Sequence, residues 1–307
     1  MFRIVPETNI NFIGARRIAF VVSLCLIALG IFAFVMISTG HAPMGIDFAG
    51  GAKVQGYFEE PVPIDDLRRA LTPLDEVKVT EVTDFEYPNA FIIKSRGAAS
   101  DSLAKVRGEE IQGILAEQFP GNNFTSVGAQ SIGPSVGEQL RSDARWAVLI
   151  SLFGIIVYIW IRFDFRSGIA ATVATFHDVL AVLGVSYALG LDFDLLIVTA
   201  LLTLAGYSLT DTVVVYDRIR ENLKKSRGRS EFVGAVNTSI NEVLSRTVNT
   251  SMTTLVVVLS LLFFGGEVLR NFALALTMGV LVGTYSSIFV ASPIVVEWEA
   301  RRPKRFK

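Results

Sequence analysis

Two aspartates lie inside stretches of sequence that are apolar enough to cross a membrane. Asp211 stands within residues 201–216, and Asp178, preceded by His177, stands within residues 170–190. A charged side chain at the centre of a bilayer costs roughly 2.5–3.5 kcal/mol on insertion scales. Because packing alone rarely justifies that cost, an acid at this depth is by default a candidate for handling protons or ions.

The residues around Asp211 in the sequence are able to support such chemistry. Tyr207 and Ser208 precede it by four and three residues, which places them on the same helix face. Thr210 belongs to an adjoining stripe of small and polar residues, and the next apolar segment opens at Arg246 with a polar run. A proton carrier needs an acid whose proton affinity changes with conformation, and movement of Arg246 would supply that change. The expected proton-coupling residues are Asp211, Arg246, Asp178 and His177.

A purely structural interpretation of the same residues is also open. Asp211 would then accept hydrogen bonds from neighbouring hydroxyl groups, or would join two helices through a buried ion pair. The pair formed by His177 and Asp178 serves packing equally well. Arg246 lies at a helix end, where its guanidinium is able to reach lipid headgroups.

A third set of residues predicts close helix packing. Small side chains recur at every fourth position near the end of the chain, the small-xxx-small spacing of tightly packed membrane helices. They are Ala275, Gly279, Gly283, Ser287 and Ala291. None of them titrates, so we expect a packing role only.

Six apolar blocks are long enough to position these groups in a membrane. The chain has 307 residues, of which 51% are hydrophobic, and about 20 apolar residues span the hydrocarbon core as a helix. The predicted spanning helices are residues 18–37, 146–161, 168–189, 195–216, 248–264 and 271–292. The first is long for a signal peptide and lacks an A-x-A cleavage site, so we expect it to be retained. Tyr216, which ends the fourth block, is expected to anchor that helix at the membrane interface.

Lysine and arginine predict the orientation of the helices. They cluster before the first block, after the second and fourth blocks, and in the basic tail, whereas the connections 190–194 and 265–268 have none. By the positive-inside rule both termini are cytoplasmic. The expected parts are a cytoplasmic N-terminus with the first helix (1–39), an extracytoplasmic domain (40–143), a five-helix transmembrane bundle (144–300) and a cytoplasmic tail (301–307). The expected location is the inner (cytoplasmic) membrane.

The external stretch has the pattern of a small α+β domain. Runs with strand character at 52–58, 77–82, 90–94 and 124–130 alternate with helical patterns at 64–71 and 103–119. The resulting order, β-α-β-β-α-β, is that of the ferredoxin-like motif.

No arrangement of residues in the sequence indicates an enzyme. Residues 45–53 superficially resemble a phosphate-binding loop, but the spacing fails the P-loop pattern and no serine or threonine follows Lys53. The external domain has no serine beside a plausible base. A net charge of −1 gives no field that would attract nucleic acid. We therefore expect no catalytic residues, no cofactor and no metal, and a lipid bilayer as the surroundings.

The polar segments resemble a known family. Residues 205–222, AGYSLTDTVVVYDRIREN, closely resemble a fourth-helix motif of the SecD/SecF family, membrane proteins of bacterial protein export. Residues 45–51, 131–137, 176–179 and 262–270 resemble further segments of that family. The resemblance covers nearly the whole chain, including six helices with one large domain after the first.

The resemblance implies a function and assigns residues to it. It implies a member of the resistance-nodulation-division superfamily that joins a SecD chain, associates with the SecYEG channel and uses the proton gradient in late export of a preprotein. The essential fourth-helix aspartate of the family falls on Asp211 and its fifth-helix arginine on Arg246. Thr210 stands where the family often has asparagine, which keeps a hydrogen-bonding group. The alternatives are a passive scaffold that braces the channel, or a small-molecule exporter, against which the single external domain argues.

Overall fold

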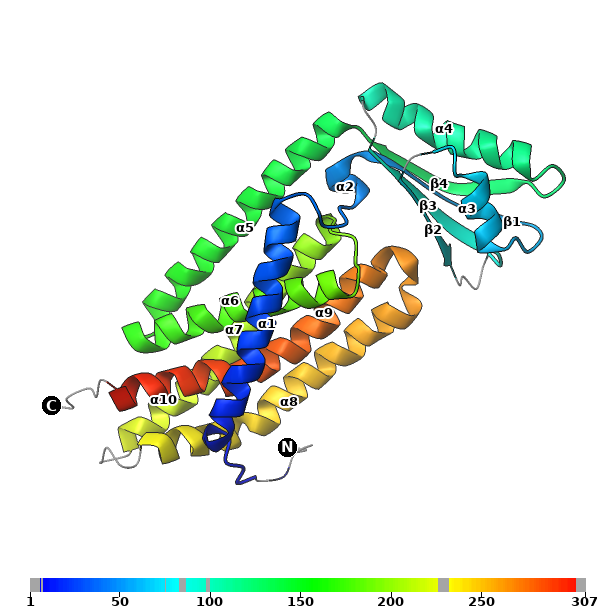
Figure 1. Ribbon diagram of the computed structural model, residues 1–307. Helices are drawn as coiled ribbons and strands as arrows, with labels where there is room; N and C mark the ends of the chain where they lie inside the picture. The colour runs from blue at the N-terminus through cyan, green and yellow to red at the C-terminus, as the bar shows by residue number, and fades with distance from the viewer. Residues whose placement is uncertain are drawn as a thin grey trace.

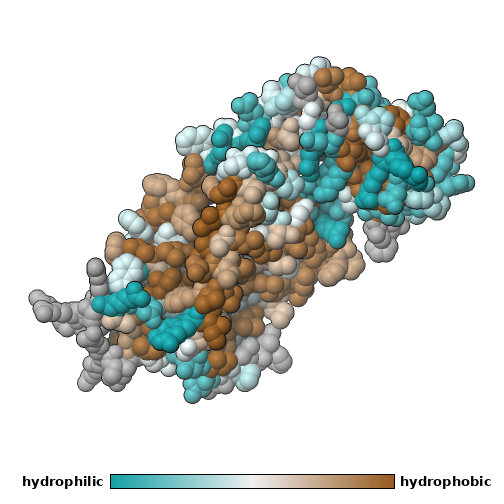
Figure 2. All heavy atoms as spheres, in the orientation of Figure 1, coloured by the Kyte–Doolittle hydropathy of each residue, from teal (hydrophilic) through white to brown (hydrophobic). Residues whose placement is uncertain are grey.

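The computed structural model describes residues 6, 8–74, 76–82, 87–97, 100–225 and 232–301. The basic tail expected at 301–307 lies outside the described residues except for Arg301. The described chain consists of a bundle of long helices with a smaller part, built on a β-sheet, at one end of it (Figure 1). Apolar residues cover the visible face of the bundle, and polar residues gather over the sheet and at the opposite end (Figure 2).

Six helices in the described part of the chain are long and apolar enough to cross a membrane, as predicted. They are α1 (Arg16–Ser38), α5 (Pro134–Arg162), α6 (Phe165–Ala188), α7 (Leu195–Lys225), α8 (Phe232–Phe264) and α9 (Gly266–Ser286). A single 3-10 turn, η1 (Ile13–Ala15), precedes α1, and a π-helical turn, η3 (Ser287–Ala291), continues α9 into α10 (Ser292–Arg301). The chain is therefore a multi-pass membrane protein.

Several helices extend beyond the predicted apolar blocks. α5 begins at Pro134 rather than at 146, and α8 begins at Phe232 rather than at 248. The added turns are polar, so hydropathy excludes them although their backbone remains helical. Tyr216 was expected to anchor the fourth helix at a membrane interface, but its side chain is buried inside the bundle. α7 continues past it to Lys225, and the buried Tyr216 hydroxyl donates to the carbonyl oxygen of Ala291 at 2.9 Å.

The six helices differ sharply in how much of their surface lies inside the protein. Within the most apolar part of each helix, 61% of α6, 50% of α7 and 56% of the span that begins with α9 is buried. The corresponding shares are 17% for α1, 11% for α5 and 17% for α8. The three central helices are thus α6, α7 and α9, and two of these carry the aspartates.

The sheet domain (residues 46–132) follows α1 in the chain. Its elements are α2 (Ile46–Ala49), β1 (Gly51–Phe58), α3 (Ile64–Ala70), β2 (Val77–Val82), β3 (Ala90–Arg96), α4 (Asp101–Gln118) and β4 (Phe124–Ile132). The strands lie in the order β2-β3-β1-β4, and every neighbouring pair is antiparallel. The predicted order β-α-β-β-α-β is therefore present, with the short α2 as an addition.

One face of the sheet forms the core of this domain. Val54, Phe58 and Ile93 from the strands pack against Leu67 of α3 and Ile111 of α4. Since side chains alternate along a strand, the intervening residues of β1, β2 and β3 point to the other face. That other face carries Lys78 and Lys94, which contact the connection between α6 and α7.

Candidate functional site

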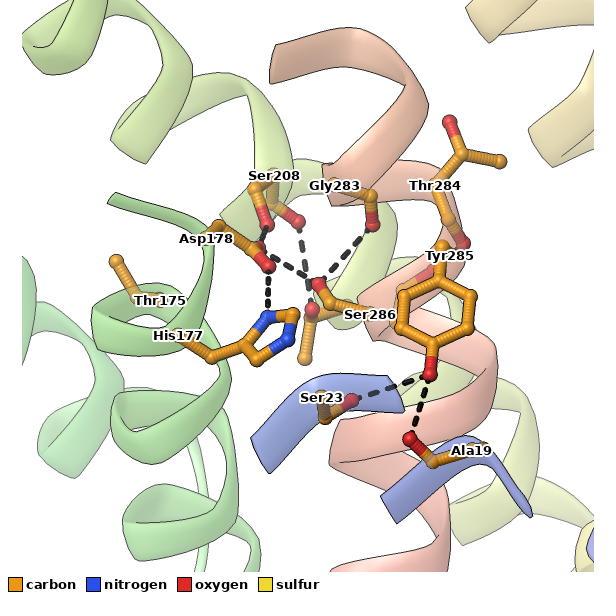
Figure 3. Close-up of polar contacts among 12 residues, drawn as sticks. Ala19, Ser23, Thr175, His177, Asp178, Ser208, Gly283, Thr284, Tyr285 and Ser286 are labelled. Carbon is orange, nitrogen blue, oxygen red and sulfur yellow. Dashed lines mark hydrogen bonds and ion pairs between the residues drawn. The ribbon is translucent and has the colours of Figure 1, made fainter. Parts of the chain in front are cut away.

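Asp178 lies at the point where the three central helices meet (Figure 3). Its side chain is fully buried. The hydroxyl of Ser286, the last residue of α9, donates to its carboxylate at 2.6 Å, and Ser208 of α7 donates to the same oxygen. The Nδ1 atom of His177 lies 2.8 Å from the other carboxylate oxygen. Asp178 therefore binds together α6, α7 and α9 through side chains that sit inside the membrane-spanning part.

His177 extends this network toward α1. Its ring centroid lies 6.2 Å from that of Tyr285, whose hydroxyl donates to the carbonyl oxygen of Ala19 at 2.8 Å. Its Nε2 atom is buried and has no hydrogen-bond partner within the part of the chain that the structure describes.

Two glycines on α9 bring the serines close to Asp178. A Cβ atom added at Gly283 would lie 3.1 Å from the Cβ atom of Ser208, and one added at Gly279 would lie 2.8 Å from a methyl group of Leu204. The predicted small-residue ladder thus faces α7 at these two positions. Ser287 is buried in the π-helical turn and donates to the carbonyl oxygen of Thr284 at 3.0 Å. Turns of this kind often occur at functional sites.

Asp211 occupies a second position on α7, one turn after Ser208. Its side chain is almost fully buried, and Ser251 of α8 lies close to it. Ser251 also contacts the hydroxyl groups of Tyr207 at 3.3 Å and of Thr284 at 2.6 Å. The Oδ2 atom of Asp211 is buried and has no hydrogen-bond partner among the described residues. One oxygen of this carboxylate is thus free to bind a proton.

Arg246 is the cation whose charge acts on Asp211. Arg246 lines an open groove of about 400 Å³ beside α7. The groove is lined by Tyr158, Leu209, Thr210, Val213, Val214, Asp217 and Arg246. Thr210 is exposed there and donates to the carbonyl oxygen of Gly206 at 3.1 Å. The groove gives the guanidinium room to move.

The predicted residues therefore form two centres rather than one. His177 and Ser208 belong to the centre at Asp178, whereas Tyr207 belongs with Asp211 through Ser251. The sequence prediction missed Ser251, Thr284 and Ser286. Ser251 stood in the polar opening of the fifth apolar block, so its composition was a usable signal. Ser286 adjoins the small-residue ladder, but nothing in its spacing indicated contact with α6. Among the described residues, no three His, Cys, Asp or Glu side chains are grouped so as to hold a metal ion.

Comparisons with known proteins agree with this architecture. The family described as "Protein export membrane protein SecD/SecF, C-terminal" matches residues 114–301. The protein translocase subunit SecF of Thermodesulfovibrio yellowstonii is 47% identical over 302 residues, which cover 96% of this chain and 97% of that protein. SecF of Desulfurispirillum indicum is 41% identical over 95% of this chain and 92% of that protein.

Solved structures show the same arrangement of helices and sheet. The crystal structure of SecDF from Thermus thermophilus matches 98% of this chain with a TM-score of 0.81 and 39% identity, and the match covers 40% of that longer chain. A structure of SecDF in a super-membrane-facing form matches the same share with a TM-score of 0.69 and 40% identity. The matches to SecF proteins run over nearly their full length and agree with a role in protein translocation. The chain belongs to the SecD/SecF family of protein-export membrane proteins.

Proposed function

We propose that the chain is a SecF subunit that works with a SecD chain and uses the proton gradient to drive late steps of preprotein export. The SecF relatives match it from end to end, which supports the subunit assignment. The SecDF relative is longer, and this chain covers 40% of it. The remainder of that protein corresponds by its name to SecD, so the proposed working unit includes a separate SecD chain and the SecYEG channel. The role is transport, not enzymatic catalysis.

The observation that carries the proposal is the unpartnered oxygen of a buried carboxylate. Asp211 is 3% exposed, and its Oδ2 atom has no hydrogen-bond partner among the described residues. Leaving a buried acceptor unsatisfied costs about 1–3 kcal/mol, and more when the group is charged. A group that binds and releases a proton gives a reason for that cost, because the unpaired oxygen is the position the proton occupies.

The two centres are connected through α7. Ser208 donates to Asp178 and lies one turn from Asp211 on the same helix. A shift of α7 would therefore alter the surroundings of both carboxylates at once. Arg246 belongs to α8 and faces the groove, so a change in the packing of α8 against α7 would alter its distance from Asp211. In the proposed cycle, proton uptake at Asp211 and movement of these helices occur together.

The proposed orientation places the sheet domain on the outer side of the inner membrane. The polypeptide enters α1 and leaves α10 at the end of the bundle that lies opposite the sheet domain (Figure 1). Arginines flank the helix ends there, at Arg16 in the first turn of α1, Arg162 in the last turn of α5 and Arg166 near the start of α6. The positive-inside rule then assigns both termini to the cytoplasm. The sheet domain is thereby available to an emerging preprotein.

The decisive experiment replaces Asp211 by asparagine, which keeps the shape and removes the titration. In vesicles with SecD and SecYEG, we expect the Asp211→Asn variant to assemble normally while gradient-dependent export falls to background. Glu221→Gln is the matched control, because Glu221 is an exposed acid further along α7. Unchanged export would refute the proposal. A loss of export that only follows a loss of assembly would favour the scaffold.

A further inference from the structure

Hydrogen bonds attach the connection between α6 and α7 to the segment that leads from α1 into the sheet domain. The amide of Phe193 donates to the carbonyl oxygen of Pro43, and the amide of Gly45 donates to that of Phe193, both at 2.8 Å. The first amide of α7, at Leu195, donates to Asp47 of α2 at 3.2 Å. Two central helices are thus attached to the segment that leads into β1.

Asp192, in the middle of this connection, is held by three cations of the sheet. Its side chain is 2% exposed. It accepts hydrogen bonds from Lys78 of β2 at 3.1 Å, from Lys94 of β3 at 3.1 Å and from Arg96 of β3 at 2.6 Å. The side chains of Lys94 and Arg96 are 22% and 19% exposed, so these pairs are largely shielded from water. This single carboxylate joins two strands to the helix pair.

The register of the sheet explains why Asp192 is needed there. Lys53 of β1 lies directly opposite Lys94, and Lys94 lies directly opposite Lys78. Three lysines therefore form a row across one face of the sheet, and like charges in directly opposite positions destabilise a strand pair. Asp192 neutralises two members of the row, while Asp47 and Asp194 act on Lys53. The sheet face and the helix connection are electrostatically complementary.

The charges of this cluster are mutually dependent. Burial by itself would raise the pKa of Asp192, but Lys94, Lys78 and Arg96 outweigh burial and hold that pKa below its ordinary value. Burial, together with the neighbouring Lys94, lowers the pKa of Lys53. Asp192 is therefore the ionised counter-charge on which the lysine row depends at neutral pH.

We propose that the cluster of Asp192 with Lys78, Lys94 and Arg96 transmits movement between the α6–α7 helix pair and the sheet domain. The inference rests on the proposed function, since that function requires the carboxylates of α6 and α7 to act on an external domain. The covalent connections lead elsewhere, because residues 39–45 join the sheet domain to α1 and residue 133 joins it to α5. Those two helices are among the least buried in the bundle. Asp192 is a positioning residue in the connection between the two helices that carry Asp178 and Asp211.

The test separates transmission from proton binding. The Asp192→Asn variant keeps the shape of the side chain and loses its charge, and we expect it to retain proton conductance in vesicles with SecD and SecYEG while export falls to background. The matched control is Asp65→Asn, which breaks an exposed ion pair with Arg68 in the sheet domain and should change neither quantity. Normal export by Asp192→Asn overturns the proposal. Loss of conductance together with export also overturns it, because Asp192 would then serve the membrane step itself.

A second measurement does not depend on proton coupling or on export. Spin labels at Cys25, an exposed residue of α1, and at Glu117→Cys on α4 report the distance between bundle and sheet domain. We expect Asp192→Asn to broaden the distance distribution in the full chain, and Lys78→Gln, which removes the most exposed cation, to broaden it less. Unchanged distributions in both variants overturn the proposal. If Asp192→Asn broadens the distance distribution but the wild type conducts no protons, the proposed function is refuted. The cluster would then still hold the sheet domain on the helix bundle.

Discussion

The packing of α9 on α7 predicts different outcomes for two similar substitutions, Gly279→Ala and Gly283→Ala. An added Cβ atom at position 283 would meet the Cβ and Cα atoms of Ser208 at 3.1 and 3.4 Å. Carbon atoms prefer about 3.5–4.0 Å, so the helices must separate by roughly 0.5 Å. At position 279 the nearest atom is a methyl group of Leu204, at the end of a flexible side chain. Although Leu204 is buried, we expect its methyl groups to shift more readily than the backbone of a helix.

The magnitudes follow from these contacts. Overpacking costs typically about 1–3 kcal/mol, and replacing glycine by alanine inside a helix returns about 1 kcal/mol. We expect Gly283→Ala to lower the free energy of unfolding by about 1 kcal/mol and Gly279→Ala to change it by less than about 0.5 kcal/mol. The functional difference should be larger, because the shift at position 283 displaces Ser208 from Asp178. Gly283→Ala should lose most gradient-dependent export, and Gly279→Ala should keep it.

The assay measures unfolding in detergent and export in vesicles with SecD and SecYEG, each normalised to the amount of assembled complex. The Ser208→Ala variant removes the hydroxyl group without adding volume, so it separates the lost hydrogen bond from the steric effect. If Gly283→Ala acts through Ser208, the double variant Gly283→Ala with Ser208→Ala should export no worse than Ser208→Ala alone. The reason is that the effects of two substitutions in contact do not add. Equal export by the two glycine variants, or additive losses of export in the double variant, would show that Gly283→Ala does not act through Ser208.

Three further outcomes follow from the same contacts. Ser286→Ala removes one donor to Asp178 and should lower the free energy of unfolding by about 0.6 kcal/mol in a chemical or thermal unfolding experiment, the average for hydrogen bonds between membrane helices. Gly30→Ala should separate α1 from α6 in a helix-to-helix distance measurement, because its Cβ atom would lie 2.2 Å from the carbonyl oxygen of Leu180. The pKa of Asp192 is lowered in the folded chain, so its stabilisation is fully present above the ordinary value of 3.8 and is lost only as pH falls through the lower folded pKa. Hydrogen exchange at residues 190–195, corrected for the intrinsic rate, should therefore stay unchanged between about pH 7 and 5.

The sequence predicted the membrane-spanning elements well because lipid imposes a simple requirement on composition. It predicted their ends poorly. α8 begins at Phe232, well before the apolar block at 248, since a helix continues into water as long as its backbone hydrogen bonds are satisfied. The strands were also predictable, because alternation of apolar side chains records which face of the sheet is covered.

The candidate site was predictable only in part. The desolvation cost of a carboxylate identified Asp178 and Asp211 from composition alone. Contact between Ser286 and Asp178 depends on the register of α9 against α6, and the small-residue ladder fixes a face without fixing a register. The lysine row depends on strand pairing, because Lys53, Lys78 and Lys94 are far apart in the chain and become neighbours only in the sheet.

Infrared difference spectroscopy of the carboxyl group measures directly whether Asp211 binds and releases a proton. Spectra of the chain assembled with SecD in a bilayer are recorded between acidic and neutral buffer, for the wild type and for Asp211→Asn. We expect a protonated-carboxyl band in the wild-type difference spectrum that is missing in Asp211→Asn and retained in the Glu221→Gln control. Identical carboxyl bands in the wild type and in Asp211→Asn would contradict this expectation.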